Sequence, residues 1–395
     1  MRPSSPGISG TPASCPSGPA RTRSCARSSH EPRDSDNPAA DSSAASMEGL
    51  MKTRITELLG IDYPILLSGM SWISVPEMVA AVSNAGGLGI LATGPLNADL
   101  TRKAIRRIRE LTDKPFGANA SLLFPGATEN ARVLLEEKVP VINFALGKGD
   151  WIVREAHGYG GKVMATVVSA RHAKRAQDYG CDAVIATGNE AAAHGEFVTT
   201  FCLIPSLVDA LTIPVVAAGG VADGRGLAAA LALGAEGVAM GTRLMTTKES
   251  PLHRNFKDLS LAKDITDTIY SKRFDGLWCR VLKTDAAERM KRKGLDLPAA
   301  FFNARDIAKS LSLPFIKLFI GVLLSGRKTA VQFAYLANAS KAFQSATEEG
   351  DMVRGVLPVG QCTGLLHDEP TVKELFERMV GEAGMIEKRM AGVFA

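Results

Sequence analysis

The sequence predicts an α/β fold in which eight parallel strands close into a (β/α)8, or TIM, barrel with an added α-helical cap domain. Short apolar stretches alternate with helical patterns at intervals of about 20–35 residues, which is typical of parallel βαβ units. Eight such stretches occur, and that number favours a closed barrel over an open, doubly wound sheet. No G-x-G-x-x-G fingerprint, which would favour the open sheet, follows any of them.

The clearest unit is residues 213–245, IPVVAAGGVADGRGLAAALALGAEGVAMGTRLM. An apolar strand leads to Gly219-Gly220, a helix from about 225 to 233 follows, and a second strand leads to Gly241-Thr242. Glycine turns at the carboxyl ends of the last two strands of such a barrel are a frequent phosphate site, because their N–H groups and those of the first helical turn can converge on an anion. The alternative is that these glycines only allow tight turns.

The other elements repeat the same pattern in chain order. The remaining strands are expected at 65–67, 88–91, 116–120, 141–145, 163–167 and 183–186, and helices at 76–85, 127–138, 151–157, 170–179 and 201–211. A final helix at about 371–389 has apolar residues at helical spacing and is expected to close the ring as the eighth barrel helix.

The composition and the strand–helix pattern change along the chain and divide it into four parts. Residues 1–50 are rich in Ser, Pro, Ala and Gly and are expected to be a disordered extension, either an organelle transit segment or an over-extended reading frame with the true start at Met47 or Met51. Residues 51–248 form the barrel, 249–359 a helical insertion without clear strands, and 360–395 the segment that closes the barrel.

Composition limits the function classes. A net charge of +5 over 395 residues gives no reason to expect a nucleic-acid partner, and no apolar stretch is long enough to span a membrane. The six cysteines show no C-x-x-C spacing, so reduced thiols in a cytoplasmic protein are expected. The oligomeric state is left open.

The strand ends carry mostly glycine and neutral hydrogen-bonding residues. They lack paired carboxylates, a metal cluster and a Ser-His-Asp set, which argues against hydrolysis and metal chemistry. Such a site suits an organic cofactor that brings its own reactivity, and flavin mononucleotide (FMN) fits the expected phosphate site. His194, after the sixth strand, is the candidate proton donor or acceptor; the alternative is a surface histidine.

From Met51 onward, over about 340 residues, the chain resembles the nitronate monooxygenase family, formerly called 2-nitropropane dioxygenases. That family includes flavin-type enoyl-[acyl-carrier-protein] reductases and NADH:quinone reductase relatives. The motifs that carry the resemblance are KTRITELLGIDYPI, AVSNAGGLGIL, LTDKPFGANASLL, AAGGVADGRGLAAALALGAEGVAMGTR, ESPLH and VGQCTGLLHDEP.

The resemblance implies an FMN-binding barrel with an added helical domain. His194 stands in the place of the family's active-site histidine and is the expected catalytic residue. The residues expected to bind the cofactor through its ring, ribityl chain or phosphate are Gly69, Met70, Asn119, Ser121, Thr166, Ala192, Gly219, Gly220, Gly241 and Thr242.

The chain departs from the family pattern at two places. Ala191-Ala192-Ala193 replaces the usual glycine-rich run before the histidine, and alanine resists a positive φ, so the loop is expected to take another path unless the glycines were not needed. Thr166 stands where some relatives carry a lysine near the flavin, which changes the electrostatics at the ring.

Three functions are compatible with these observations. The first is FMN-dependent oxidation of alkyl nitronates by dioxygen, with His194 as the general base or as a hydrogen-bond donor that stabilises an anion. The second is an NAD(P)H-dependent FMN reductase of enoyl-ACP thioesters or quinones, in which the basic segment 272–293 meets an acidic acyl carrier protein or a pyridine-nucleotide phosphate. The third is a flavin-binding protein without turnover. Each of the first two takes a small-molecule substrate.

Overall fold

The computed structural model describes residues 51–395, so the predictions for residues 1–50 lie outside the described residues. Eight parallel strands stand in the order β1-β8-β7-β6-β5-β4-β3-β2. A single parallel bridge between Leu66 and Leu88 joins β1 to β2 and closes the ring. The predicted class of fold is therefore confirmed. The strands are β1 (Ile65–Leu67), β2 (Gly89–Ala92), β3 (Phe116–Ser121), β4 (Val141–Ala145), β5 (Lys162–Val167), β6 (Ala183–Thr187), β7 (Val215–Ala218) and β8 (Gly237–Met240).

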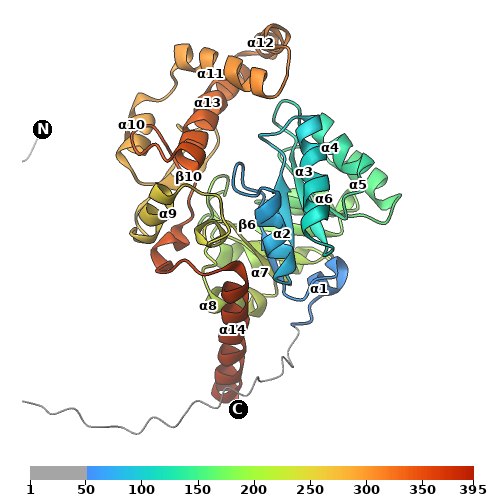
Figure 1. The fold of residues 1–395 in the computed structure, drawn as a ribbon. Helices are drawn as coiled ribbons and strands as arrows, with labels where there is room; N and C mark the ends of the chain where they lie inside the picture. The colour runs from blue at the N-terminus through green and yellow to red at the C-terminus, as the bar shows by residue number, and fades with distance from the viewer. Residues whose placement is uncertain (1–50) are drawn as a thin grey trace, which may run out of the picture. The chain divides into compact units, whose positions relative to one another are not determined.

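A helix follows each barrel strand and packs on the outside of the ring (Figure 1). In chain order these are α2 (Pro76–Asn84), α3 (Ala98–Leu111), α4 (Ala127–Glu136), α5 (Asp150–His157), α6 (Ala170–Asp178), α7 (Thr200–Ala210), α8 (Gly224–Ala232) and, after the insertion, α14 (Val372–Phe394). None of the described helices is long and apolar enough to cross a membrane.

Two apolar layers hold the ring together. The inner faces of the strands pack with Ile55 and Leu59 of the short helix α1 (Arg54–Leu59) inside the barrel. The outer faces pack against the helices in a larger core that includes Leu375, Phe376 and Met379 of α14. Because α14 packs against α8 and α2, it fills the eighth helix position, as predicted.

The prediction that the insertion between β8 and α14 is helical, without clear strands, was partly wrong. Besides helices it contains an antiparallel hairpin of β9 (Thr268–Ser271) and β10 (Cys279–Leu282). The hairpin strands have only four residues each, too few for a clear period of two in the sequence. The helices are α9 (Arg254–Leu261), α10 (Asp285–Lys293), α11 (Leu297–Ser310), α12 (Phe315–Leu324) and α13 (Arg327–Gln344), with short turns at η1 (Leu244–Thr246), η2 (Ser345–Glu349) and η3 (Gln361–Leu365).

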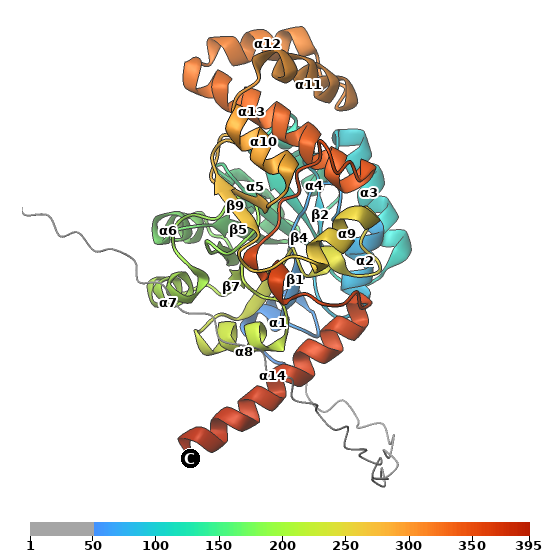
Figure 2. The ribbon, with the colours of Figure 1, turned by 90° about the vertical axis from the view of Figure 1, so that its left-hand side faces the viewer.

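The insertion covers one end of the barrel. Figure 1 and Figure 2 show α13 above the strands, with α11 and α12 beyond it on the side away from the barrel. The hairpin lies lower and is joined to the barrel by a bridge between Ala193 and Arg280. The exact domain limits at 248/249 and 359/360 stay predictions.

Candidate functional site

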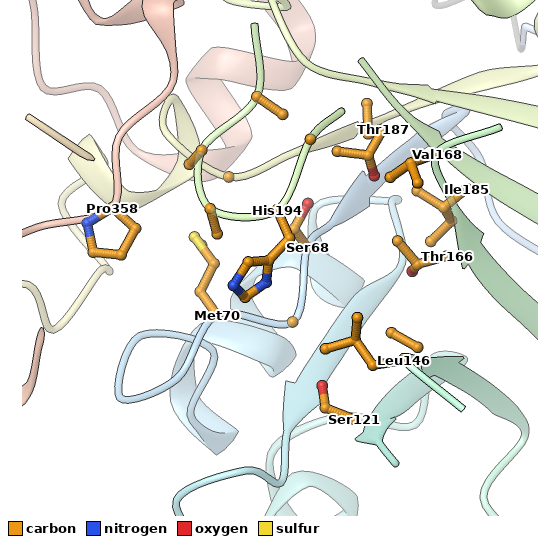
Figure 3. A pocket seen from close by; sticks show the side chains of 18 of the residues that line it. Ser68, Met70, Ser121, Leu146, Thr166, Val168, Ile185, Thr187, His194 and Pro358 are labelled. Atoms are coloured by element: carbon orange, nitrogen blue, oxygen red, sulfur yellow. The ribbon is translucent and has the colours of Figure 1, made fainter. Parts of the chain in front are cut away.

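A cavity of about 780 Å³ lies at the carboxyl ends of the barrel strands, between the barrel and the insertion. Its volume is in the upper part of the range of roughly 300–1,000 Å³ that is usual for ligand and cofactor sites. Figure 3 shows side chains from several strands and from the insertion around it. All eleven predicted site residues line this cavity: Gly69, Met70, Asn119, Ser121, Thr166, Ala192, His194, Gly219, Gly220, Gly241 and Thr242.

The two glycine turns present unpaired backbone donors to the cavity. Gly219 and Gly220 have φ values of +110° and +79°, which L side chains rarely adopt. Within residues 51–395, no acceptor is found for the N–H groups of Gly219, Gly220, Gly241 or Thr242. Backbone donors that line a cavity without a partner need an acceptor from a ligand or water. The pattern fits a phosphate group.

The first turn of α8 does not add to these donors, contrary to the prediction that helical N–H groups contribute. The N–H of Arg225 donates to the capping carboxylate of Asp223 at 3.0 Å. The N–H of Gly224 donates to Glu382 of α14 at 2.8 Å. The acids that join α8 to the ring-closing helix therefore occupy these donors.

A polar network crosses three neighbouring strands on the floor of the cavity. The amide of Asn119 donates to Oδ1 of Asn143 at 2.6 Å, and the amide of Asn143 donates to Oγ1 of Thr166 at 3.1 Å. Ser121 donates to Oδ1 of Asn119 at 3.0 Å. Asn119 and Asn143 face each other in the β3–β4 register, and both are buried. Asn143 was not predicted, although a single amide inside the apolar strand VINFA marks it.

The end of β1 approaches this network closely. A Cβ on Gly69 would lie 2.8 Å from Cβ of Asn119, so only glycine fits there. Across the cavity, a Cβ on Gly241 would lie 3.3 Å from the sulfur of Met70. Gly69 and Gly241 therefore leave room between β1, β3 and β8, and the Met70 side chain lies over this space beside His194 (Figure 3).

The loop that carries His194 keeps a left-handed residue despite its alanines. Ala193 has a φ of +52°, whereas Ala191 and Ala192 have no positive φ. Two hydrogen bonds with the backbone of Arg280 in β10, of 3.2 and 3.0 Å, fix Ala193. The Arg280 guanidinium also donates to the backbone and side-chain oxygens of Asn189, at 3.1 and 2.8 Å. The hairpin of the insertion thus holds the loop that carries His194.

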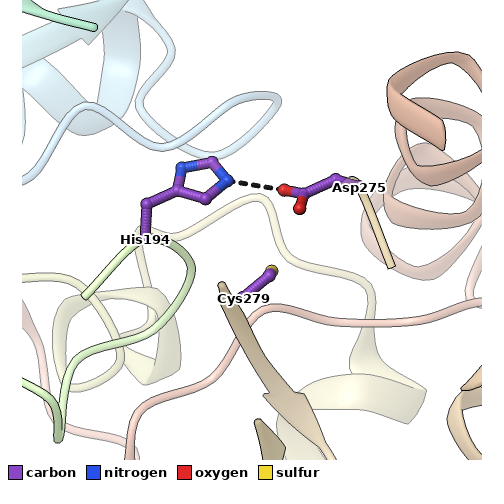
Figure 4. A group of neighbouring side chains, drawn as sticks. All are labelled: His194, Asp275 and Cys279. Carbon is purple, nitrogen blue, oxygen red and sulfur yellow. Dashed lines mark hydrogen bonds and ion pairs between the residues drawn. The ribbon is translucent and has the colours of Figure 1, made fainter. Parts of the chain in front are cut away.

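His194 is joined to a buried carboxylate. Its Nε2 lies 2.5 Å from Oδ2 of Asp275, whose side chain is only 1 % exposed (Figure 4). The other carboxylate oxygen accepts from the N–H of Leu277 at 3.0 Å. No partner is found for His194 Nδ1 in the described part of the chain. An Nε2–H donated to Asp275 leaves Nδ1 as the nitrogen that can exchange a proton with a ligand.

Cys279 completes this cluster. Its Sγ, the His194 ring and the Asp275 carboxylate have ligand atoms within 4.8 Å of one another, and these three side-chain types can bind zinc. Burial raises the pKa of the Cys279 thiol well above its usual value, and the nearby Asp275 raises it further. The protonated thiol can take part in a hydrogen bond with the Asp275 carboxylate. The absence of a metal stays a prediction.

The segment before α14 returns to the site. The N–H of Gly360 donates to Oγ1 of Thr242 at 2.9 Å, and the N–H of Gln361 donates to the carbonyl of Glu190 at 2.9 Å. A Cβ on Gly360 would lie 2.9 Å from that carbonyl oxygen. The motif VGQCTGLLHDEP therefore joins the last strand to the histidine loop. Burial raises the pKa of the neighbouring Cys362 thiol to about 11.

These features fit a flavin. The unpaired donors at Gly219, Gly220, Gly241 and Thr242 suit a phosphate, and the Asn119 network suits the hydrogen-bonding edge of a ring or a polyol chain. The apolar and small residues between them leave space for a flat ring. The fold and the site together define a class of barrel enzymes, the flavin-dependent oxidoreductases.

Comparison with known proteins narrows this class. The family model described as nitronate monooxygenase matches residues 52–132 and 124–382. The chain is 39% identical over 338 residues to a (3aS,4S,5R,7aS)-5-hydroxy-7a-methyl-1-oxo-octahydro-1H-indene-4-carboxyl-CoA dehydrogenase of Rhodococcus jostii, covering 84% of this chain and 96% of that protein. It is 31% identical over 293 residues to a probable nitronate monooxygenase of Staphylococcus aureus, covering 62% of this chain and 82% of that protein.

Among solved structures, FabK from Thermotoga maritima is similar, with a TM-score of 0.72 and 37% sequence identity over 87% of this chain and 99% of that chain. The chain belongs to the nitronate monooxygenase family. Members of this family differ in activity, and the choice among them rests on the cavity.

Three residues that the sequence did not single out line or support the site. Asp275 and Gly360 lie in the insertion and the returning segment, far in sequence from the residues they contact. Local signals exist for Asn143, which is an amide in a buried strand, and for Gly360, which lies in the motif VGQCTGLLHDEP. An aspartate in the exposed-looking stretch SKRFDGLW gives no such signal.

Proposed function

We propose that this chain is an FMN-dependent oxidoreductase that acts on a coenzyme A thioester. The observation that carries the choice of substrate is a group of basic residues that line the cavity, which we call the cationic rim: Lys148, His172, Arg175 and Lys272. These four side chains are exposed, and none of them has an ion-pair partner within the described residues. Coenzyme A carries several phosphate charges, whereas an alkyl nitronate carries one negative charge.

The rim is built from three separate elements. Lys148 follows β4, His172 and Arg175 lie on α6, and Lys272 follows β9 of the hairpin. Lys272 also lies over the ring of Trp278, with Nζ 5.3 Å from the ring centroid, and this ring lines the cavity and stacks on Tyr270. Among the acids that line the cavity, Glu190 accepts from Thr200 and Asp275 contacts His194, which leaves Glu196 as the one exposed carboxylate. The exposed part of the lining therefore carries three permanent positive charges, on Lys148, Arg175 and Lys272, against one negative charge, on Glu196.

His194 and the cavity floor have distinct roles in this proposal. Nδ1 of His194 takes a proton from, or returns it to, the acyl part of the thioester, while Asp275 holds the ring in place through Nε2. Gly219, Gly220, Gly241 and Thr242 hold the phosphate of FMN, and Asn119 and Ser121 contact its polar edge. When bound, FMN supplies the two-electron redox chemistry that the protein side chains lack.

The test compares substrates with and without the nucleotide. Purified holoprotein, with its flavin reduced under anaerobic conditions, is mixed with an enoyl-CoA and with the same enoyl group on N-acetylcysteamine. We expect the CoA thioester to reoxidise the flavin at least about 10-fold faster, because remote binding energy contributes to the rate. Equal rates, or no reoxidation by either thioester, would overturn the proposal.

Nitronate oxidation is the second candidate, favoured by the similarity to the probable nitronate monooxygenase of S. aureus. Oxygen uptake with propionate-3-nitronate, above that of free FMN, would support it. A third arm adds NADPH or NADH to the oxidised holoprotein. Rapid loss of the flavin absorbance on addition of either dinucleotide would favour the NAD(P)H-dependent reductase that acts on enoyl-ACP or quinones.

A further inference from the structure

Helix α12 exposes its apolar side chains. It has the sequence FIKLFIGVLL and contains no buried residue. Its five most outward large side chains recur at i, i+3, i+4, i+7 and i+8, the spacing of one helix face. They are Ile316, Phe319, Ile320, Leu323 and Leu324, with exposed fractions of 73, 38, 51, 57 and 82 %. A helix in a water-soluble protein normally turns this stripe toward the core.

Helix α11 extends the same surface. Leu297, Phe301 and Phe302 are exposed by 62, 41 and 60 %. The ring of Phe301 meets the rings of Phe315 and Phe319 edge to face, with centroids 5.3 and 5.4 Å apart. The two helices therefore present one continuous apolar surface, which we call the cap tip. It lies beyond α13, away from the barrel (Figure 2).

The charges around the cap tip are mostly positive. Arg305, Lys309, Lys317, Arg327 and Lys328 are exposed, and no ion pair involves them within residues 51–395. Asp306 is the nearby acid without a basic partner, since Asp296 pairs with Lys293 at 2.5 Å. An apolar helix face beside several cations has the composition of a segment that lies in the interface of an anionic lipid membrane.

We propose that the cap tip binds the surface of an anionic lipid bilayer, with α12 lying in the interface. Ten residues give a helix of about 15 Å, too short to cross a bilayer but long enough to lie in the headgroup region. The charges argue against a second copy of the chain as the occupant. A two-fold interface would bring this surface against a copy of itself, so the five cations of each copy would gather in one interface, with too few acids among the described residues of the cap tip to pair with them.

The cap tip is connected to the cavity through one helix. Leu336, Ser340 and Phe343 of α13 line the cavity, and α11 and α12 pack on the same helix. Docking through the cap tip would therefore place α13 between the barrel and the lipid surface (Figure 2). This inference stands on the exposed helix and does not depend on the substrate of the reaction.

The test uses the full-length holoprotein and sedimentation with vesicles. We expect binding to equimolar phosphatidylglycerol and phosphatidylcholine to be about 10-fold tighter than to phosphatidylcholine alone, and to weaken as salt is added. The variant Ile316→Ser/Ile320→Ser/Leu324→Ser should lose this binding. Lys317→Glu/Lys328→Glu should lose the preference for the anionic vesicles. Flavin absorbance shows that each variant is folded.

A matched control removes exposed apolar side chains elsewhere. Met385, Val393 and Phe394 on α14 are exposed by 64, 68 and 81 %, so their change to Ser removes a similar amount of surface. This variant should bind vesicles like the unmodified chain. Unchanged binding of the α12 variant would overturn the proposal. A dimer in sedimentation velocity that Ile316→Ser/Ile320→Ser/Leu324→Ser converts to a monomer would overturn it in favour of self-association.

Discussion

At the scale of single residues, the chemistry of the site depends on a contact between distant parts of the chain. His194 comes from the loop after β6, whereas Asp275 and Cys279 come from the hairpin of the insertion. Asp275 is fully buried and has one oxygen on His194 and the other on the N–H of Leu277. A carboxylate held in this way keeps the imidazole in one orientation and one tautomer.

The His194–Asp275 contact gives the first prediction. His194→Ala is expected to lower kcat by about 10²–10⁴-fold and Asp275→Asn by about 10–100-fold, with the flavin absorbance of the protein retained. If the two residues act as a unit, the double variant should be no slower than His194→Ala alone. Steady-state rates of the four proteins test this. Multiplicative losses would contradict a positioning role for Asp275.

Ala193 gives the second prediction. Its φ of +52° is unfavourable for alanine and worse for a β-branched residue. We expect Ala193→Val to lower kcat and to lower the free energy of unfolding by about 1–2 kcal/mol. Ala193→Gly should change stability by less than about 1 kcal/mol, because the relief of strain is offset by a more flexible unfolded chain. Thermal unfolding followed by circular dichroism measures the stability of both variants. Equal changes in the free energy of unfolding for Ala193→Val and Ala193→Gly would show that the positive φ of residue 193 does not limit which side chain it can carry.

At the scale of elements, the turn after β7 holds two glycines that differ in how closely their neighbours approach. A Cβ on Gly219 would lie 3.1 Å from the backbone nitrogen of Ala191 and 3.1 Å from Oγ1 of Thr200. A Cβ on Gly220 would meet only Glu190, at 3.7 Å, which is ordinary contact. Both residues have positive φ, so both substitutions strain the backbone, but only the first also pushes the turn against its neighbours.

The third prediction follows from that difference. Gly219→Ala should raise the Kd of FMN by at least about 10-fold, because the turn must shift and carry its donors with it. Gly220→Ala should raise it by less. Titration of the apoprotein with FMN, followed by flavin fluorescence, measures both values. A larger effect at Gly220 would show that contact with the neighbouring loop does not set the position of the turn.

The cationic rim gives the fourth prediction, which depends on the proposed substrate. Arg175→Ala and Lys272→Ala should each raise KM for a CoA thioester by about 5–20-fold, the usual range for losing a charged hydrogen bond to phosphate. KM for the N-acetylcysteamine thioester should not change. Arg171→Ala, an exposed cation on α6 that does not line the cavity, is the control. A uniform rise for both thioesters would place these side chains at the acyl group and not at the nucleotide.

The same elements show what sequence can and cannot predict here. Strands and turns of the barrel follow local rules, so the positions of Gly219-Gly220 and Gly241-Thr242 at strand ends could be predicted from the local sequence pattern. No bounds were predicted for helix α3, although its apolar residues recur at helical spacing. The contacts of Asp275 and Gly360 could not be predicted, although Gly360 lies in the motif VGQCTGLLHDEP, because these contacts span 81 and 118 residues of chain.

At the scale of the whole described chain, the insertion interrupts the barrel between its last strand and its last helix. The ring is complete only when α14 returns to α8 and α2. Arg243, just after β8, has a side chain that is 2 % exposed and lies 2.6 Å from Oδ1 of Asp368. Arg378 of α14 contacts the other oxygen of Asp368 at 2.6 Å. One carboxylate thus connects the last strand with the last helix.

The fifth prediction concerns the stability of this closure. The hydrogen bond from Arg378, together with the charge of Arg243, lowers the pKa of the Asp368 carboxyl despite partial burial. A carboxyl with a lowered pKa in the folded state contributes stability above its unfolded pKa of about 3.9 and loses it as pH falls through the folded pKa. Asp368→Asn should therefore lower the free energy of unfolding at pH 7 by roughly 1–2 kcal/mol, below the value for a fully buried pair because Asp368 is 45 % exposed.

Thermal unfolding at several pH values measures how much the Asp368 carboxylate stabilises the closed ring. At pH 7 we expect Tm of Asp368→Asn to be lower by about 1–3 °C, because a chain of this length has a large entropy of unfolding. The difference should shrink as the pH falls below about 3.9 and then through the lower pKa of the folded-state carboxyl. Asp150→Asn removes an exposed pair with Arg154 on α5 and should change the free energy of unfolding by less than about 0.5 kcal/mol. A difference in Tm that stays constant down to pH 3 would show that the Asp368 side chain stabilises the ring through its shape and not its charge. A Tm equal to that of the unmodified chain at pH 7 would show that the apolar contacts of Leu375, Phe376 and Met379 hold α14 in place without it.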